Sequence, residues 1–249
     1  MTCYDNFAQI YDLLMDDVDY KKWAEYLHHL IERHKGINIS TVLDLACGTG
    51  NITIPMARLG YNLWGIDASE QMLSIAENKA RIHGEKIKFL RQDMRDLHLT
   101  KKFDAVICAC DGINYITDKN ELNKVFQGVN RILNPGGIFI FDISSFYKLE
   151  RILGNNIFIE EKNGIFYSWE NEFDDNSSIV TMRLNFFVPD GKLYRRIEEI
   201  HIQKAYKVED VYEILIKTDF RDIEVFDEFR YTEPDEKSER IFFAVKKCQ

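Results

Sequence analysis

The sequence predicts an α/β protein built on a doubly wound, mostly parallel sheet, and three observations support this. Between residues 41 and 143, short apolar strands alternate with helical segments, a pattern typical of a parallel sheet buried on both faces. A glycine loop, Cys47-Gly48-Thr49-Gly50, directly follows the first strand. Beyond residue 157, turn sequences such as Asn163-Gly164 and Asp190-Gly191 predict hairpins and hence an antiparallel sheet.

The composition indicates a folded globular chain. Its 249 residues are 45% hydrophobic and 29% charged, which is ordinary for one large domain or a domain with an insertion. A net charge of −9 argues against nucleic acid as a partner. No apolar run is long enough to span a membrane, and no secretory signal is evident, so we expect no membrane contact and a cytoplasmic location.

The N-terminal region, residues 1–36, predicts two cap helices. Apolar residues recur at helical spacing from Phe7 to Leu14 and again from Tyr20 to Ile31. Asp19 is placed to cap the second helix, and Gly36 to end it.

The parallel part follows from residue 41 onward. Its expected strands are 41–45, 63–67, 87–91, 105–109 and 138–142, separated by helices that start near Ile52, at Ser69 and at Lys119. The segment Asn134-Pro135-Gly136-Gly137 is expected as a turn before the fifth strand. Right-handed crossovers place the carboxyl ends of these strands at one edge, where we expect the ligand.

The pattern changes after Asp142. A helix is expected over 146–153, then strands over 157–161, 165–173, 179–188 and 193–203. We interpret about 150–205 as an antiparallel β insertion that packs over the ligand edge, with an inert extension of the sheet as the alternative. A helix over 208–216 and strands over 223–229 and 240–246 complete a single domain, 1–249.

The residues around the glycine loop favour a cationic ligand without phosphate. The dinucleotide fingerprint requires a third glycine where this chain has Thr53. Asp44, just before the loop, would repel a pyrophosphate. A nicotinamide-dependent oxidoreductase is therefore the less favoured interpretation.

The segment Asp44-Leu45-Ala46-Cys47-Gly48-Thr49-Gly50 resembles the first motif of class I S-adenosylmethionine (SAM)-dependent methyltransferases, which more often have Gly in place of Ala46. Tyr4-Asp5-x-Phe7-Ala8-x-x-Tyr11-Asp12 and Asp111-x-x-Asn114-Tyr115 are similar to segments of bacterial small-molecule methyltransferases. This resemblance implies a Rossmann-like seven-stranded sheet of order 3-2-1-4-5-7-6. It also implies methyl transfer from SAM to a nitrogen or oxygen of a small-molecule acceptor, with S-adenosylhomocysteine as product.

The fourth motif is neither Asn-Pro-Pro-Tyr nor Pro-Cys, so adenine or glutamine amino groups and nucleobase C5 atoms are not expected as acceptors. A non-catalytic SAM-binding or regulatory module stays open as the alternative. We expect a monomer or a homodimer.

The resemblance and the spacing together assign a cofactor site. Asp67 ends the second strand about 20 residues past the glycines, where a carboxylate that binds ribose hydroxyls is expected. The resemblance places Asp93 at the adenine amino group, Met94 or Met72 over the adenine, and aromatic side chains at the methionine end. The expected site comprises Tyr11, Tyr20, Trp23, Asp44, Ala46, Cys47, Gly48, Gly50, Asp67, Ala68, Met72, Gln92, Asp93, Met94, Cys110 and Asp111.

Three residues are candidates for handling the acceptor. His201 is the candidate base, because a histidine pKa can lie near neutrality; a structural histidine is the alternative. Asn114 and Tyr115 are candidates for orienting the acceptor. No metal is expected, since Cys108-Ala109-Cys110 lacks a second pair of ligands at zinc-type spacing.

Overall fold

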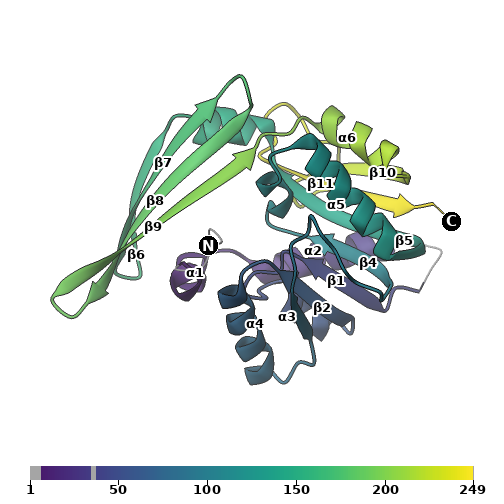
Figure 1. Cartoon of the computed structure of the whole chain (residues 1–249), viewed down its shortest axis with the longest axis horizontal. Helices are drawn as coiled ribbons and strands as arrows, with labels where there is room; N and C mark the ends of the chain where they lie inside the picture. The colour runs from purple at the N-terminus through teal and green to yellow at the C-terminus, as the bar shows by residue number, and fades with distance from the viewer. Residues whose placement is uncertain (1–6, 35–37, 249) are drawn as a thin grey trace.

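The computed structural model describes residues 7–34 and 38–248, which form two sheets and their flanking helices (Figure 1). In chain order the elements are α1 (Ala8–Leu14), α2 (Tyr20–Arg33), β1 (Thr41–Leu45), α3 (Thr53–Arg58), β2 (Asn62–Asp67), α4 (Glu70–Ile82), β3 (Lys88–Arg91), β4 (Phe103–Cys108), η1 (Gly112–Tyr115), α5 (Lys119–Ile132), β5 (Leu133–Ser144), η2 (Lys148–Leu153), β6 (Ile157–Lys162), β7 (Ile165–Asp174), β8 (Ile179–Asp190), β9 (Leu193–Lys204), α6 (Val208–Lys217), β10 (Phe220–Asp227) and β11 (Arg240–Lys247).

The larger sheet has seven strands in the order β3-β2-β1-β4-β5-β11-β10. Counted along the chain within this sheet, that order is 3-2-1-4-5-7-6, so the expected topology is confirmed. β1 pairs in parallel with β2 and β4, whereas β11 is antiparallel to both β5 and β10. The carboxyl ends of β1, β2, β3 and β4 therefore meet at one edge.

One expected turn is part of a strand. The segment Asn134-Pro135-Gly136-Gly137 lies inside β5, which begins at Leu133. Leu133 pairs with Phe103 of β4, and the register shifts between this pair and the next, Ala105 with Ile138. The proline and glycines therefore form an irregularity within the strand ladder, where a proline is tolerated. They do not form a separate turn before the strand.

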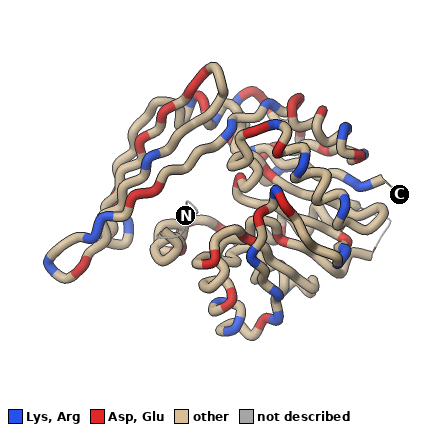
Figure 2. Tube along the Cα trace, in the orientation of Figure 1, with Lys and Arg blue, Asp and Glu red and all other residues tan. Residues whose placement is uncertain are grey.

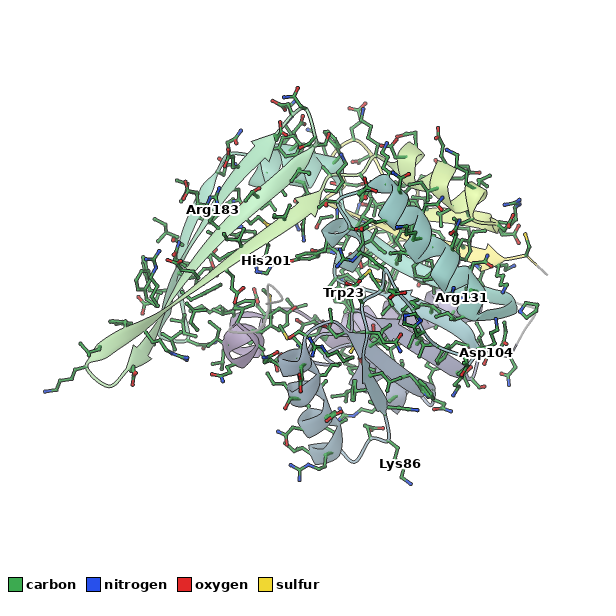
Figure 3. The ribbon with its side chains drawn as sticks, viewed as in Figure 1. Trp23, Lys86, Asp104, Arg131, Arg183 and His201 are labelled. Carbon is green, nitrogen blue, oxygen red and sulfur yellow. The ribbon has the colours of Figure 1, made fainter. Side chains whose placement is uncertain are left out.

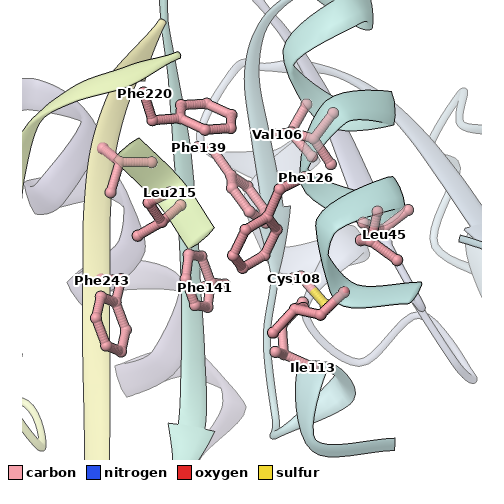
Figure 4. Close-up of a cluster of buried hydrophobic side chains, with 14 of the residues drawn as sticks. Leu45, Val106, Cys108, Ile113, Phe126, Phe139, Phe141, Leu215, Phe220 and Phe243 are labelled. Carbon is pink, nitrogen blue, oxygen red and sulfur yellow. The ribbon is translucent and has the colours of Figure 1, made fainter. Parts of the chain in front are cut away.

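The core lies on both faces of the seven-stranded sheet. On one face α5 and α6 pack their apolar sides against β4, β5 and β11, with Phe126, Phe139, Phe141, Leu215 and Phe243 fully buried among them (Figure 4). On the other face α2 covers β1, β4 and β5. Burial of each such side chain contributes about 1.5–3 kcal/mol, which fixes the sheet as a rigid platform.

Local signals set several element boundaries. Asp19 caps α2 by accepting a hydrogen bond from Lys22 N at 2.9 Å, as expected, and Ser69 caps α4 in the same way. The expected stop at Gly36 lies outside the described residues. The helix expected over 146–153 is present, with Lys148–Leu153 in π-helical geometry.

The second sheet has four antiparallel strands, β6-β7-β8-β9, and projects as a long ribbon beside the first (Figure 1). α1 lies between this ribbon and α4 in the same view. Phe7, Ile10 and Leu14 pack against Ile165, Phe186 and Ile197 of the second sheet. We call the side of the second sheet that carries these three residues its inner face.

β9 buries its polar side chains. His201 shares the inner face with Glu199 and Gln203, as expected, but this polar face is the buried one. Ile200 and Ile202 on the opposite face are 52% and 45% exposed. If Ile200 and Ile202 faced inward instead, burial of each would stabilise the fold by about 1.5–3 kcal/mol. Apolar packing alone therefore does not explain why β9 turns its polar face inward.

Charges are mixed along the chain. Short segments of Lys and Arg and of Asp and Glu are scattered over the described trace, between longer uncharged stretches (Figure 2). Among the described residues, no helix is long and apolar enough to cross a membrane.

Candidate active site

A cavity of about 440 Å³ lies at the carboxyl edge of the parallel strands. Fourteen of the residues expected from the sequence line it: Tyr11, Tyr20, Asp44, Ala46, Cys47, Gly48, Asp67, Ala68, Met72, Gln92, Asp93, Met94, Cys110 and Tyr115. Side chains from the first four parallel strands and from both cap helices therefore converge on one space.

The glycine loop opens this cavity at the end of β1. Gly48 has φ +54, and a Cβ added there would meet no atom within 4 Å, so the backbone leaves room for a ligand. Gly50 has φ +78 but lies behind the wall, where an added Cβ would contact Ala76 Cβ at 3.3 Å. Gly50 thus permits the turn and lets the loop pack closely on α4. We had expected Gly50 to line the cavity, and it does not.

Asp44 is a buried acid beneath the loop. Its side chain accepts a hydrogen bond of 2.6 Å from Thr53 Oγ1, at the position where a dinucleotide site would have its third glycine. Burial raises the pKa of Asp44 to about 7, although the Thr53 hydrogen bond opposes this rise. A cationic group in the cavity would stabilise the ionised form.

Asp67 lies at the end of β2 and faces the same cavity. Its carboxylate accepts backbone hydrogen bonds from Gly48 N at 2.9 Å and Ser69 N at 2.8 Å. These bonds fix the carboxylate across the loop and the start of α4. Burial nevertheless raises the pKa of Asp67 above its usual value.

The residues after β3 form the opposite wall. Gln92, Asp93 and Met94 line the cavity, and so does Arg95, which the sequence reasoning missed. Arg95 Nε donates to Asp93 Oδ1 at 2.9 Å, and this hydrogen bond lowers the pKa of Asp93. The Asp93 carboxylate is therefore held in its ionised, hydrogen-bond-accepting form.

The first cap helix is fastened to the glycine loop by Asp12. Asp12 accepts hydrogen bonds from Thr49 Oγ1 at 2.7 Å and Asn51 Nδ2 at 2.9 Å, and forms a 2.8 Å ion pair with Lys79 of α4. Burial raises the pKa of Asp12, but the hydrogen bonds from Lys79 and Thr49 outweigh it and the pKa is lowered. The neighbouring Tyr11 is thereby held over the cavity.

Two aromatic hydroxyls stand at this end of the cavity. Burial raises the pKa of Tyr11 far above its ordinary value and that of Tyr20 to about 12. Both side chains therefore stay neutral at physiological pH. Their rings supply π faces of the kind that attract a cation.

Tyr115 links the cavity to the second sheet. Tyr115 follows β4 at the cavity wall, and its hydroxyl lies 2.8 Å from His201 Nδ1 on β9. Figure 3 shows His201 on the side of β9 turned toward the seven-stranded sheet. Burial lowers the pKa of His201 to about 4, opposed by the charge of Asp111. His201 is therefore neutral at pH 7, and its pKa lies below the near-neutral range that made it the candidate base.

Trp23 lies away from the cavity. It is 5% exposed and packs between Phe242 and Phe229 in the core, beneath the guanidinium of Arg240 at 5.2 Å. α2 presents Tyr20 to the cavity, whereas Trp23, one turn further along, faces the sheet. The cofactor contact expected of Trp23 is not found.

Asp111 also lies outside the cavity lining. It forms an ion pair with Arg240 at 3.0 Å and accepts a hydrogen bond of 2.7 Å from Gln203 Nε2. Arg240 also pairs with Asp142, whose pKa is raised to about 6 by burial. Asp111 joins β9 and β11 to the end of β4 instead of contacting a ligand there.

Asn114 is fully buried and bonds to backbone. Its Nδ2 donates to Ser144 O at 3.0 Å and Lys204 O at 2.9 Å, and its Oδ1 accepts from Ser144 N at 2.9 Å. These bonds tie η1 to β5 and β9. Contrary to our expectation, the Asn114 amide is occupied by backbone groups and holds the frame of the site.

The sequence reasoning missed several lining residues besides Arg95. They are Thr49, Asn51, Ile52, Ser69, Ala109, Gly112 and Ile116. Each is a near neighbour in the chain of a residue that was expected. The motif signal therefore located the loops correctly but did not say which side chains in them turn inward.

The cavity fits SAM. An acid for the ribose, an open glycine backbone, a buried acid whose ionisation a cation would favour, and two aromatic hydroxyls all face one space. Its lining is mostly neutral or acidic, which suits a sulfonium and an ammonium group. Asp67 would hold the ribose, and Tyr11 and Tyr20 would surround the methionine end.

Known proteins support this interpretation. A family model described as a methyltransferase domain matches residues 42–137. A relative named "Putative methyltransferase YqeM", from Bacillus subtilis (strain 168), is 37% identical over 99% of this chain and 98% of its own length.

Solved structures show the same likeness over the whole chain. A SAM-dependent methyltransferase from Clostridium acetobutylicum is 41% identical, with a TM-score of 0.90 and full coverage of both chains. The sugar N-methyltransferase KedS8 from Streptoalloteichus shares the fold, with a TM-score of 0.78 at 20% identity over 96% of this chain and 93% of its own. Taken with the cavity, these matches show that the chain belongs to the class I SAM-dependent methyltransferases.

Proposed function

We propose that this methyltransferase acts on a nitrogen atom of a small-molecule amine. SAM supplies an electrophilic methyl group on its sulfonium sulfur. What the chain must do is bring the acceptor to that methyl, align it and keep water away, a proximity effect that can supply about 7–11 kcal/mol. Tyr115 lines the cavity and contacts His201 of the second sheet, and this position supports a role in the alignment.

The observation that carries the choice of nitrogen is the low basicity of His201. Its pKa is lowered to about 4 by burial. An aliphatic hydroxyl acceptor releases its proton about as reluctantly as water, with a pKa near 15.7, and a base as weak as His201 gives little help. An alkylammonium, with a pKa of about 10, gives up its proton to solvent far more readily than a hydroxyl does, and the neutral amine then attacks through its lone pair.

Relatives named for nitrogen acceptors support the proposal. KedS8 is a sugar N-methyltransferase. A glycine/sarcosine N-methyltransferase from Aphanothece halophytica is 24% identical over 83% of this chain. Both names concern nitrogen acceptors.

The test is a transfer assay with methyl-labelled SAM and paired acceptors. Each amine is matched with its hydroxyl counterpart: glucosamine with glucose, ethanolamine with ethylene glycol, and propylamine with propan-1-ol. We expect labelled N-methyl products, identified by mass spectrometry and NMR. Labelled O-methyl products from the hydroxyl partners would refute the choice of nitrogen. SAM binding without transfer to this panel or to a broad metabolite extract would favour a binding module.

The cytoplasmic location and the monomeric or dimeric state expected from the sequence belong to this proposal. Cell fractionation and light scattering of the purified protein test them directly.

A further inference from the structure

The turn that follows β4 has an unusual backbone. Cys110 and Asp111 have φ angles of 59 and 54, although neither residue is glycine. Left-handed backbone is uncommon for such residues, and it persists only where the surrounding groups fix it. Cys110 and Gly112 line the cofactor cavity, whereas Asp111 between them turns away from it. The conformation of this turn therefore decides the shape of one wall of the cavity.

Asp111 is held by three groups that are distant in the chain. Its backbone N–H donates to Asp142 Oδ2 at 2.9 Å. Its carboxylate forms a 3.0 Å ion pair with Arg240 and accepts a hydrogen bond of 2.7 Å from Gln203 Nε2. These partners belong to β5, β11 and β9. The seven-stranded sheet and the second sheet together therefore hold the turn.

Arg240 is the centre of these contacts. Its guanidinium also pairs with Asp142 and, at 3.7 Å, with Glu228. Its Cζ atom lies 5.2 Å from the ring centre of Trp23. The side chain is only 12% exposed. A planar guanidinium with several fixed partners keeps one orientation, so Arg240 determines where the Asp111 carboxylate lies.

The turn borders the end of the cavity where the methionine part of SAM would lie. Burial raises the pKa values of Tyr11 and Tyr20, and the nearby Cys110 thiol adds to both rises. Cys110 is therefore close to the two aromatic hydroxyls that would surround the methionine end. The sulfonium sulfur and its methyl group belong to that part of SAM, so a displaced turn would change the surroundings of the transferred methyl.

We propose that Arg240 and Gln203 are positioning residues of the methyl transfer. Neither side chain lines the cavity, so both act through Asp111. They hold the left-handed turn, and the turn places Cys110 against the methyl-bearing end of SAM. Because Gln203 belongs to β9, the same contact fixes the second sheet relative to this turn. The inference uses methyl transfer from SAM, and it does not depend on whether the acceptor atom is nitrogen or oxygen.

The first test needs no acceptor. SAM with an isotope-labelled methyl carbon is bound at saturation, and the methyl signal is recorded by NMR. Gln203→Met removes the hydrogen-bond donor but keeps the length of the side chain. Arg240→Lys keeps the charge but replaces the planar fork by a single ammonium group. We expect the bound methyl signal of both variants to be shifted or broadened relative to the wild type, with the SAM dissociation constant changed by less than about threefold.

Thr218→Val is the matched control. Thr218 is 4% exposed at the end of α6, and its Oγ1 donates to Ile214 O at 2.9 Å. This variant therefore also loses one buried hydrogen bond, but outside the contacts of Asp111. Its bound methyl signal is expected to coincide with that of the wild type. The Tm of each variant separates a displaced turn from a less stable fold.

The second test is kinetic and uses the acceptors that the transfer assay finds. Gln203→Met is expected to lower kcat about tenfold or more, because a misplacement of about 1 Å can slow a reaction about 100-fold. The KM for SAM is expected to change by less than about threefold. Arg240→Lys should retain more of kcat than Arg240→Met, because its ammonium group can still pair with Asp111. If Arg240→Met does not fold, Gln203→Met and Arg240→Lys still decide the question.

Three results would overturn the proposal. The first is a bound methyl signal in Gln203→Met and Arg240→Lys that coincides with the wild type. The second is an equal displacement in Thr218→Val, since the loss of any buried hydrogen bond would then have this effect. The third is a raised KM for SAM with unchanged kcat, because both residues would then act on binding. Labelled O-methyl products would refute the choice of nitrogen alone, and the methyl signal would still judge the role of Arg240 and Gln203.

Discussion

Replacing Asp44 by Asn is expected to make the cofactor-free protein more stable at neutral and alkaline pH. Asp44 is 2% exposed, and its side chain accepts a hydrogen bond from the hydroxyl of Thr53. Burial raises its pKa from 3.8 to about 7. Ionising this carboxylate therefore disfavours the folded state when no cation lies in the cavity.

The size and sign of the effect follow from linkage. A rise of about three pKa units, at about 1.4 kcal/mol each, corresponds to roughly 4 kcal/mol. Because the folded pKa is the higher one, the stabilising contribution of Asp44 is complete below pH 3.8. It is lost progressively as the pH rises from about 4 through about 7. Asp44→Asn lacks this loss, so its advantage grows over that window and levels off above it.

The assay is chemical denaturation of both proteins from pH 5 to pH 8.5, with calorimetric titration of SAM beside it. The same substitution is expected to weaken SAM binding by about tenfold or more, since the cation loses its carboxylate. The control is Asp104, which lies near the amino end of β4, the strand that pairs with β1. Burial raises its pKa, but hydrogen bonds from the backbone of Thr41 and Ser40 outweigh it and the pKa is lowered.

Asp104→Asn should therefore change the free energy of unfolding in the opposite direction to Asp44→Asn. Its stabilising contribution is present above the unfolded pKa and lost as the pH falls through the lower folded pKa, so this variant is less stable than the wild type at pH 7. A stability difference for Asp44→Asn that did not change between pH 5 and pH 8.5 would refute the reasoning. A loss of stability at pH 8 would do the same.

Three further substitutions test other parts of the site. Asp67→Asn is expected to weaken SAM binding by roughly tenfold or more, because the charge-assisted bonds to the ribose are lost; calorimetry showing unchanged affinity would exclude this role. His201→Ala is expected to leave SAM affinity intact and to lower kcat through loss of the contact with Tyr115; equal turnover would remove His201 from the mechanism. Asp12→Asn and Lys79→Met are expected to show a coupling energy of about 0.2–1 kcal/mol in a double-mutant cycle, since both side chains are partly exposed; a coupling energy of zero would mean that their ion pair does not hold α1.

Much of the fold could be predicted because its signals are local. The strand β1 begins and ends at the expected residues, Thr41 and Leu45. A short apolar run directly before a glycine loop is typical of a buried strand. Asp67 was placed by its position at the end of a strand. In both cases a parallel sheet sends every strand end to the same edge, so position in the chain gives position in space.

Side-chain direction could not be predicted in the same way. Trp23 and Tyr20 are one helical turn apart, and the packing of α2 on the sheet decides that Tyr20 meets the cavity while Trp23 meets Phe242. Asn114 carries an amide of the kind that can orient an acceptor, but this amide is hydrogen-bonded to backbone groups of β5 and β9. These partners lie 30 and 90 residues away in the chain, beyond the reach of a local pattern.

The sequence by itself determined the alternation of strands and helices, the glycine loop, the acids at the ends of the first two strands and the family resemblance, and that resemblance implied the strand order. The tertiary structure alone decided that the polar face of β9 is the buried one, and that burial makes His201 neutral. Alternation along a strand shows which side chains share a face, but it does not show which face is covered. That depends on where α1 and the seven-stranded sheet lie, and so does the pKa of every group between them.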